Sequence, residues 1–161
     1  GFGIWPRAIV WGFLGMGISM AMTIFSSGVP FFLKTMGMEN AITVMGESLS
    51  WDKVFVAFCI SVAQNTIFAP VFMTLHKITD TNILTHGGTL AGFFTPIQMG
   101  EIMANLNWRV QWNFVFKKTI PFFWFPAHTI TFLLPGDMRV LFAALLGVVL
   151  GVLLAIATHK K

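Results

Sequence analysis

The sequence predicts an all-α, polytopic membrane protein with four transmembrane helices and one amphipathic helix lying at the membrane interface. Its composition is the first reason: 56% of the 161 residues are hydrophobic and 10% are charged, whereas a soluble domain carries about 25% charged residues. The second is a mean hydropathy of +0.79. The third is the grouping of apolar residues into runs near the ~20 residues that cross a hydrocarbon core. The length suits a single membrane domain.

The first two predicted spans cover residues 8–28 and 54–75. The first follows Arg7 and is rich in glycine, serine and alanine, which let transmembrane helices approach closely. Its apolar run is interrupted by the stretch SSGVP at residues 26–30. Ser50 precedes the second span, and its hydroxyl is predicted to cap that helix.

Residues 90–116 are predicted to form a helical segment at the interface. Glu101 lies inside its first apolar stretch, and a carboxylate at the centre of a span costs about 2.5–3.5 kcal/mol. A surface location is therefore preferred to a fifth span. Trp108 and Trp112 then repeat at helical spacing beside basic residues, as in a helix lying on a membrane.

The last two predicted spans cover residues 119–134 and 140–157. At 1.5 Å per residue the third is ~24 Å long, shorter than the ~30 Å hydrocarbon core. Adjoining turns or local thinning of the bilayer must supply the difference. The fourth contains Gly147 and Gly151, a GxxxG pair suited to close helix packing. Arg139 is expected to anchor the turn between these spans at the interface.

The basic residues predict the orientation. With four spans, seven of the ten Lys and Arg residues fall on one side and three on the other. The positive-inside rule then places both termini on the cytoplasmic or matrix side of a bacterial or mitochondrial inner membrane. A fifth span would give the same ratio. The seven residues are Arg7, Lys77, Arg109, Lys117, Lys118, Lys160 and Lys161, and the three are Lys34, Lys53 and Arg139.

Four polar residues inside the spans are the candidate functional site. Gln64 and Asn65 lie near the middle of the second span, and His128 and Thr131 lie three residues apart on the third, on one helix face. One interpretation is a polar interior or pathway, because an ionisable residue inside a membrane is usually functional. The other is packing through interhelical hydrogen bonds, worth about 0.6 kcal/mol each on average.

Two prolines precede His128 and shape the expected site. Pro121 and Pro126 each free a carbonyl about one turn earlier, and Pro126 is expected to kink the helix and make room for a polar interior. His128 is also a candidate haem or pigment ligand from one side. Haem more often takes a second axial histidine, and no other histidine falls within a predicted span. We therefore expect no cofactor and no metal.

Enzymatic activity is not expected. The sequence contains no HExxH, no G-x-S-x-G and no phosphate-binding glycine loop. His76 and Asp80 are spaced for acid–base work, but a polar cap at a helix end explains them as well. Cys59 is the single cysteine, which excludes an internal disulfide and a multi-cysteine metal site.

The same composition limits the expected partners. The basic residues form no aromatic-interleaved stripe, so a nucleic-acid partner is not expected. Membrane lipids are expected partners, together with other membrane subunits or further copies of the chain.

Several motifs resemble those of one known family. They are QNTIFAP at residues 64–70, NW at 107–108, WFP at 124–126, and P-x-x-x-R-V-L-F at 135–142. Together they resemble the Mpv17/PMP22 family of small membrane proteins, and the chain is read as a divergent member. The interval between the last two prolines is two residues shorter than usual. His128 and Thr131 stand where the family has Gln and Asn, and the usual Trp-Asn of the last helix is absent.

The resemblance implies a four-helix membrane protein of the mitochondrial inner membrane, peroxisomes or bacteria, with channel or solute-transfer activity. A channel-like or solute-transfer protein with a polar interior is therefore the leading functional hypothesis. The alternative is a non-catalytic accessory subunit of a larger membrane complex, which would pack against its neighbours through Gly147 and Gly151.

Overall fold

The described part of the chain is built from helices. The computed structural model describes residues 2–159, leaving aside the side chains of residues 154, 155 and 157–159, and that part contains no strand. The all-α prediction is confirmed. Lys160 and Lys161, which the orientation argument counted, lie outside the described residues. In chain order the elements are α1 (Ile4–Thr35), η1 (Thr43–Gly46), α2 (Trp51–Ile67), α3 (Ala69–Thr85), α4 (Leu90–Phe93), α5 (Met99–Asn105), α6 (Trp108–Val110), η2 (Gln111–Trp124), α7 (Phe125–Leu133) and α8 (Gly136–His159).

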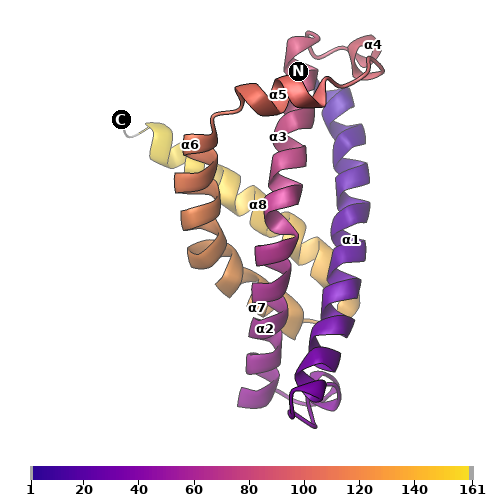
Figure 1. Cartoon of the computed structure of the whole chain (residues 1–161), viewed down its shortest axis with the longest axis vertical. Coiled ribbons are helices and arrows are strands. Elements are labelled where there is room, and N and C mark those ends of the chain that lie inside the picture. Colours follow the sequence, from indigo (N-terminus) through magenta and orange to yellow (C-terminus); the bar gives the residue numbers. More distant parts are fainter. Residues whose placement is uncertain (1, 160–161) are drawn as a thin grey trace.

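The chain runs back and forth along the long axis of the molecule (Figure 1). α1 leads from the end that carries the N-terminus to a loop containing η1 at the opposite end. α2 and α3 return, and α4, α5 and α6 follow at the first end. η2 and α7 then descend, and α8 rises obliquely, so both termini lie toward the same end.

Two described helices, α1 and α8, are long and apolar enough to cross a membrane. α2 and α3 pass the same test as a pair, but they are bent by 44° at their junction. The described residues thus contain two candidate spans, or three if the bent pair is one span. The third predicted span, residues 119–134, falls on η2 and α7.

α1 continues through the stretch that was expected to interrupt it. Pro30 lies inside the helix, and the hydroxyl of Ser27 donates to the carbonyl of Thr23 at 2.7 Å. A proline removes one backbone donor. In a bilayer the remaining backbone groups can bond only to one another within the helix. The helix therefore continues past the proline and ends at Thr35.

The second predicted span is a broken helix. Ser50 caps its start as predicted, since the hydroxyl accepts from the amide of Lys53 at 3.2 Å. The break falls at Phe68, between α2 and α3. Pro70 is in the first turn of α3. Its nitrogen carries no hydrogen to donate to the carbonyl of Thr66, and its ring pushes that carbonyl away. The bend follows from this proline.

The predicted interfacial segment consists of three short helices, α4, α5 and α6, which lead into η2. Pro96 lies in the gap between α4 and α5, and Leu106 ends α5. η2 is a π-helix, in which the backbone bonds reach one residue further back than in an α-helix. Trp112 and Phe116 meet edge to face along it, with ring centroids 6.5 Å apart.

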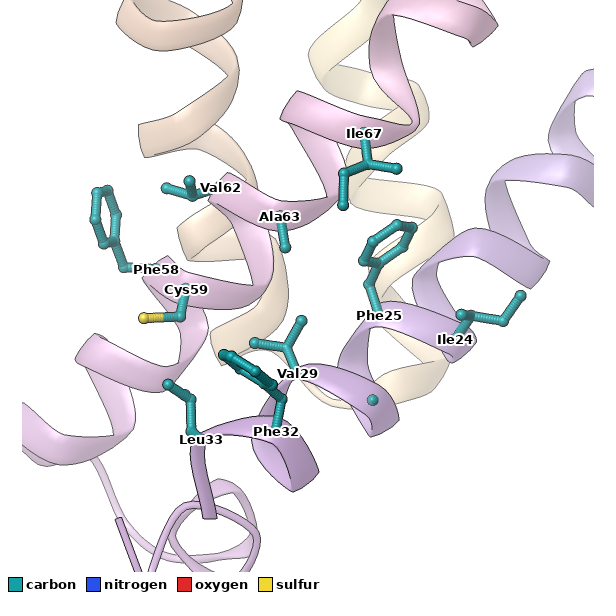
Figure 2. A pocket seen from close by; sticks show the side chains of 11 residues that line it. Ile24, Phe25, Val29, Phe32, Leu33, Phe58, Cys59, Val62, Ala63 and Ile67 are labelled. Carbon is teal, nitrogen blue, oxygen red and sulfur yellow. The ribbon is translucent and has the colours of Figure 1, made fainter. Parts of the chain in front are cut away.

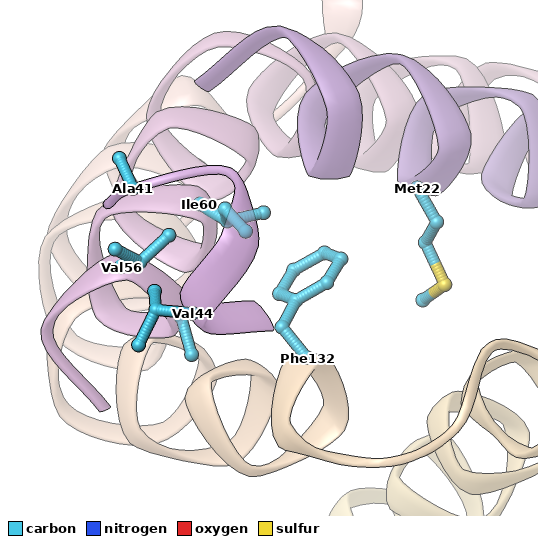
Figure 3. Close-up of a cluster of buried hydrophobic side chains, with 7 residues drawn as sticks. Met22, Ala41, Val44, Val56, Ile60 and Phe132 are labelled. Atoms are coloured by element: carbon cyan, nitrogen blue, oxygen red, sulfur yellow. The ribbon is translucent and has the colours of Figure 1, made fainter. Parts of the chain in front are cut away.

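The apolar core lies at the loop end of the bundle, where α1, α2 and α7 meet (Figure 3). Phe132 of α7 is fully buried, with Met22 of α1 on one side and Ile60 of α2 on the other. Ala41 and Val44 close the cluster from the loop and η1. The connection between α1 and α2 is therefore part of the packed structure.

One ion pair joins α1 to α3 within the described residues. The Arg7 Nε donates to Asp80 Oδ1 at 2.7 Å, and both side chains are about one third exposed. His76 lies instead against Trp11, with ring centroids 4.9 Å apart. Asp80 thus serves a tertiary contact that its spacing from His76 did not reveal.

This ion pair yields a prediction of modest size. We expect Asp80→Asn to lower the free energy of unfolding by about 0.5–1 kcal/mol, because partly exposed pairs are screened by solvent. The measurement is denaturant unfolding in detergent micelles, with Glu39→Gln, an exposed carboxylate in the loop after α1, as the control. Equal losses in the two variants would mean that the pair contributes nothing specific.

Candidate functional site

The polar residues of α2 and α7 meet at the most extensive helix–helix contact of the molecule. The two helices come from different parts of the chain and pack against each other, and the hydroxyl of Ser61 on α2 bonds the main chain of α7. The residues predicted to form a polar interior are all buried there. Their exposed fractions are Gln64 3%, Asn65 3%, His128 7% and Thr131 0%.

Ser61 links the two helices directly. Its hydroxyl, fully buried, donates to the main-chain carbonyl of Phe125 at 2.8 Å. The Asn65 Nδ2 donates to the Ser61 carbonyl at 2.8 Å and lies 3.3 Å from its hydroxyl oxygen. The sequence analysis did not select Ser61, although its position one turn before Asn65 inside a span was the available signal.

His128 is held by its own helix. Its Nδ1 lies 3.1 Å from the Thr131 hydroxyl oxygen, and that hydroxyl donates to the carbonyl of Ala127 at 3.2 Å. Because the single hydroxyl proton is used on Ala127, the neutral imidazole is assigned its proton at Nδ1. Nε2 is then an acceptor. The indole of Trp124 stacks on the imidazole with centroids 5.1 Å apart and planes 15° apart.

Two buried polar atoms in this region have no hydrogen-bond partner among the described residues. They are the amide oxygen Oε1 of Gln64 and the indole Nε1 of Trp124. One is an acceptor and the other a donor. A buried group left unbonded costs about 1–3 kcal/mol, so such atoms are uncommon and call for an explanation.

We call the set formed by these side chains the polar seam. It comprises Ser61, Gln64, Asn65, Trp124, His128 and Thr131. The seam is closed by contact between α2 and α7, and its members come from two stretches about sixty residues apart in the chain.

The two predicted kink prolines lie at the junction beside the seam. Pro121 is inside η2, and Pro126 is in the first turn of α7, where the helix changes from π to α geometry. The carbonyl of Phe125 at this junction accepts from both Ser61 and the Thr129 hydroxyl, the latter at 2.7 Å. Hydroxyl groups therefore stabilise the backbone where the helix type changes.

Arg139 binds the main chain at the end of α7. It donates from Nε to the carbonyl of Leu134 at 3.1 Å and from Nη2 to that of Phe132 at 3.3 Å. Its guanidinium also lies 5.6 Å from the centroid of the Phe132 ring. Arg139 thus donates hydrogen bonds to carbonyls at a helix C-terminus, and it connects the start of α8 to the core.

The predicted packing glycines of α8 have open surroundings. A Cβ built on Gly147 or Gly151 would meet no atom within 4 Å. Neither glycine is therefore used for packing between described parts of this chain.

An apolar cavity of about 570 Å³ lies apart from the seam, between α1 and α2 (Figure 2). Phe25 and Val29 of α1 and Ala63 and Ile67 of α2 line it, and Figure 2 shows the Cys59 sulfur as the one heteroatom among the labelled side chains. No residue of the polar seam lines this cavity. Its chemistry suits acyl chains or an apolar side chain.

No protein-family model, curated protein or solved structure matches the chain. Within residues 2–159, no group of three or more His, Cys, Asp or Glu side chains is placed to hold a metal ion. The polar seam is therefore the feature of the described residues that points to a function.

Proposed function

We propose that the chain is a small integral membrane protein that transfers a small polar solute through the polar seam. The observation that carries the proposal is the unbonded pair of Gln64 Oε1 and Trp124 Nε1. A seam that served only helix packing would satisfy its own polar atoms, because polar groups in a membrane interior are costly. A passing solute could donate to the Gln64 oxygen and accept from the Trp124 indole, together or in turn.

The transmembrane arrangement that we propose has four passes, formed by α1, by α2 with α3, by η2 with α7, and by α8. η2 has 14 residues and α7 has 9. Their 23 residues would reach ~35 Å if all were α-helical, and the wider π-helical turns of η2 shorten this toward the ~30 Å of a hydrocarbon core. The alternating course of the chain in Figure 1 supports this arrangement. Lys117 and Lys118 within η2 would extend their ammonium groups toward the headgroups.

The orientation and location follow from the distribution of charge. Both termini would face the cytoplasm or the matrix, with Lys34, Lys53 and Arg139 toward the opposite side. An inner membrane of a bacterium or mitochondrion fits this rule. Membership of the Mpv17/PMP22 family is part of the same proposal, and it rests on the motifs at residues 64–70 and 135–142.

The proposed movement separates α7 from α2. Ser61 holds the helices together through one hydrogen bond to Phe125, beside the two prolines. Helices that contain proline bend at low cost, because one backbone bond is already missing. Opening there would expose His128 and Gln64 to a solute without unfolding either helix.

The test is a flux assay in proteoliposomes with small neutral solutes, such as urea and glycerol, and with protons. We expect wild-type protein to pass one of these, and Gln64→Ala and His128→Ala to reduce its rate about tenfold, the effect of losing one hydrogen bond in the pathway. Thr66→Ala, at an exposed residue of the same helix, is the control. Absence of flux, or equal flux in all variants, would contradict the proposal.

A second function, as a non-catalytic accessory subunit, is favoured by one observation on α8. Only 6% of its membrane-length window is buried, and Gly147 and Gly151 are open to a close neighbour. Under this alternative α8 packs against another membrane subunit or a second copy. Purification in mild detergent followed by native mass spectrometry tests it, and a chain that always runs alone would eliminate it.

A further inference from the structure

A second cavity is lined by residues of α3, of α5 and of the segments next to α5. These helices lie at the end of the molecule where α1 begins (Figure 1). The cavity measures about 560 Å³, within the range of small-molecule sites. Unlike the apolar cavity between α1 and α2, it has charged and polar residues in its lining, although apolar atoms form the larger share of its surface. It shares no residue with the polar seam, so its role is independent of solute transfer.

The walls of this cavity carry opposite charges. Lys77 projects from α3 and Glu101 from α5. Neither takes part in the ion pair found among residues 2–159, which joins Arg7 to Asp80. The cavity therefore presents one cation and one anion that form no ion pair with each other. A ligand that carries both charges could bind to the two at once.

A buried amide completes the site. Asn82 lines the cavity and is only 3% exposed. Its main-chain carbonyl accepts from Thr85 and lies 2.8 Å from His86 Nδ1, whereas its side-chain amide bonds to no described residue. The Asn82 amide atoms are not among the buried atoms that lack a partner, so the amide is open to the cavity, where it can donate to and accept from a partner. The cavity is the space from which such a partner can reach it.

We propose that this cavity binds a zwitterion, a small group with one ammonium and one anionic oxygen function. Lys77 binds the anionic oxygens, Glu101 binds the ammonium, and Asn82 bonds the part between them. Ile102 and Leu106 supply apolar wall beside the charged groups. The ligand is an aminoalkyl phosphate or an amino acid, free in solution or carried as the headgroup of a membrane lipid.

The experiment uses the purified chain in detergent, with O-phosphoethanolamine as the probe in calorimetry. Inorganic phosphate and ethylammonium each present one half of that probe. We expect the zwitterion to bind at least tenfold more tightly than either half. Lys77→Gln and Glu101→Gln should each weaken binding about threefold to fivefold, as befits charges that are exposed to solvent. Lys34→Gln and Glu39→Gln, at the opposite end, are the matched controls and should change nothing.

Asn82→Leu separates ligand binding from a structural role. If the amide serves the ligand, this variant loses binding more than tenfold while its unfolding midpoint is unchanged, since the side-chain amide bonds to no described residue. If Asn82→Leu does not fold, the two charge variants still decide the matter, because their side chains are exposed.

The source of the zwitterion is decided by vesicles. Native mass spectrometry after reconstitution into phosphatidylethanolamine or phosphatidylglycerol vesicles should show retention of the first lipid alone if a headgroup is the ligand. Binding of the soluble probe without lipid retention identifies a free zwitterion. Equal affinity for a half-ligand and the zwitterion, wild-type affinity in both charge variants, or no binding of either source overturns the proposal.

Discussion

Phe132→Ala is expected to lower the free energy of unfolding by about 2–4 kcal/mol, the largest loss we predict for a single substitution. The side chain is fully buried where α1, α2, η1 and α7 meet. Its removal leaves a cavity, and cavities in packed cores cost roughly 24 cal/mol per Å³. We expect a loss about 1 kcal/mol below the ~3–5 kcal/mol typical of Phe→Ala in soluble cores, because a bilayer adds little hydrophobic transfer energy between helices.

The substitution also acts on the turn that follows. Arg139 lies over the Phe132 ring and bonds the adjacent carbonyls, so losing the ring loosens the start of α8. Denaturant unfolding in mixed micelles measures the loss. Phe122→Ala is the matched control on the same continuous helix, since its ring is 81% exposed, and it should change stability by less than about 0.5 kcal/mol. Similar losses in both variants would mean that the cluster does not hold the bundle together.

The fold class was predictable because composition and run length alone determine it. A chain with this share of apolar residues is expected in lipid, and a helix is the simplest structure in which every backbone group finds a hydrogen-bond partner there. The helix boundaries were less predictable. The run through Pro30 reads as an interruption, yet α1 continues to Thr35, because one missing donor does not stop a helix whose other bonds have no competing partner. Pro70, which entered the sequence analysis only as the end of the motif at residues 64–70, lies at the junction where the helix pair is bent by 44°.

The members of the site were predictable as residue types, but their partners were not. Gln64, Asn65 and His128 stand out in sequence because polar groups are rare in apolar runs. Pairing α2 with α7 depends on shape complementarity between segments about sixty residues apart, which spacing does not encode. Ser61 and Trp124 gain their roles only through that pairing. The partner of Asp80 was unpredictable for the same reason, because Arg7 lies on another helix and sequence spacing does not encode helix pairing.

Gln64→Met is expected to raise the free energy of unfolding by about 1–2 kcal/mol while reducing solute flux about tenfold. Methionine matches glutamine in length and flexibility, and it removes the Oε1 atom that has no partner among the described residues. Replacing an unbonded buried polar group by an apolar group of similar shape is neutral or stabilising. Gain of stability with loss of activity is the pattern of a residue kept for function.

Ser61→Ala gives the opposite sign and makes the comparison decisive. It removes the donor to the Phe125 carbonyl and the hydroxyl beside the Asn65 amide, so we expect a loss of about 1–2 kcal/mol. Both variants are measured by unfolding in the same micelles, and their flux by the same liposome assay. If Gln64→Met destabilises the protein as Ser61→Ala does, then Gln64 belongs to the packing between α2 and α7. The seam is then an adhesive contact, and the accessory-subunit function becomes the better account of this chain.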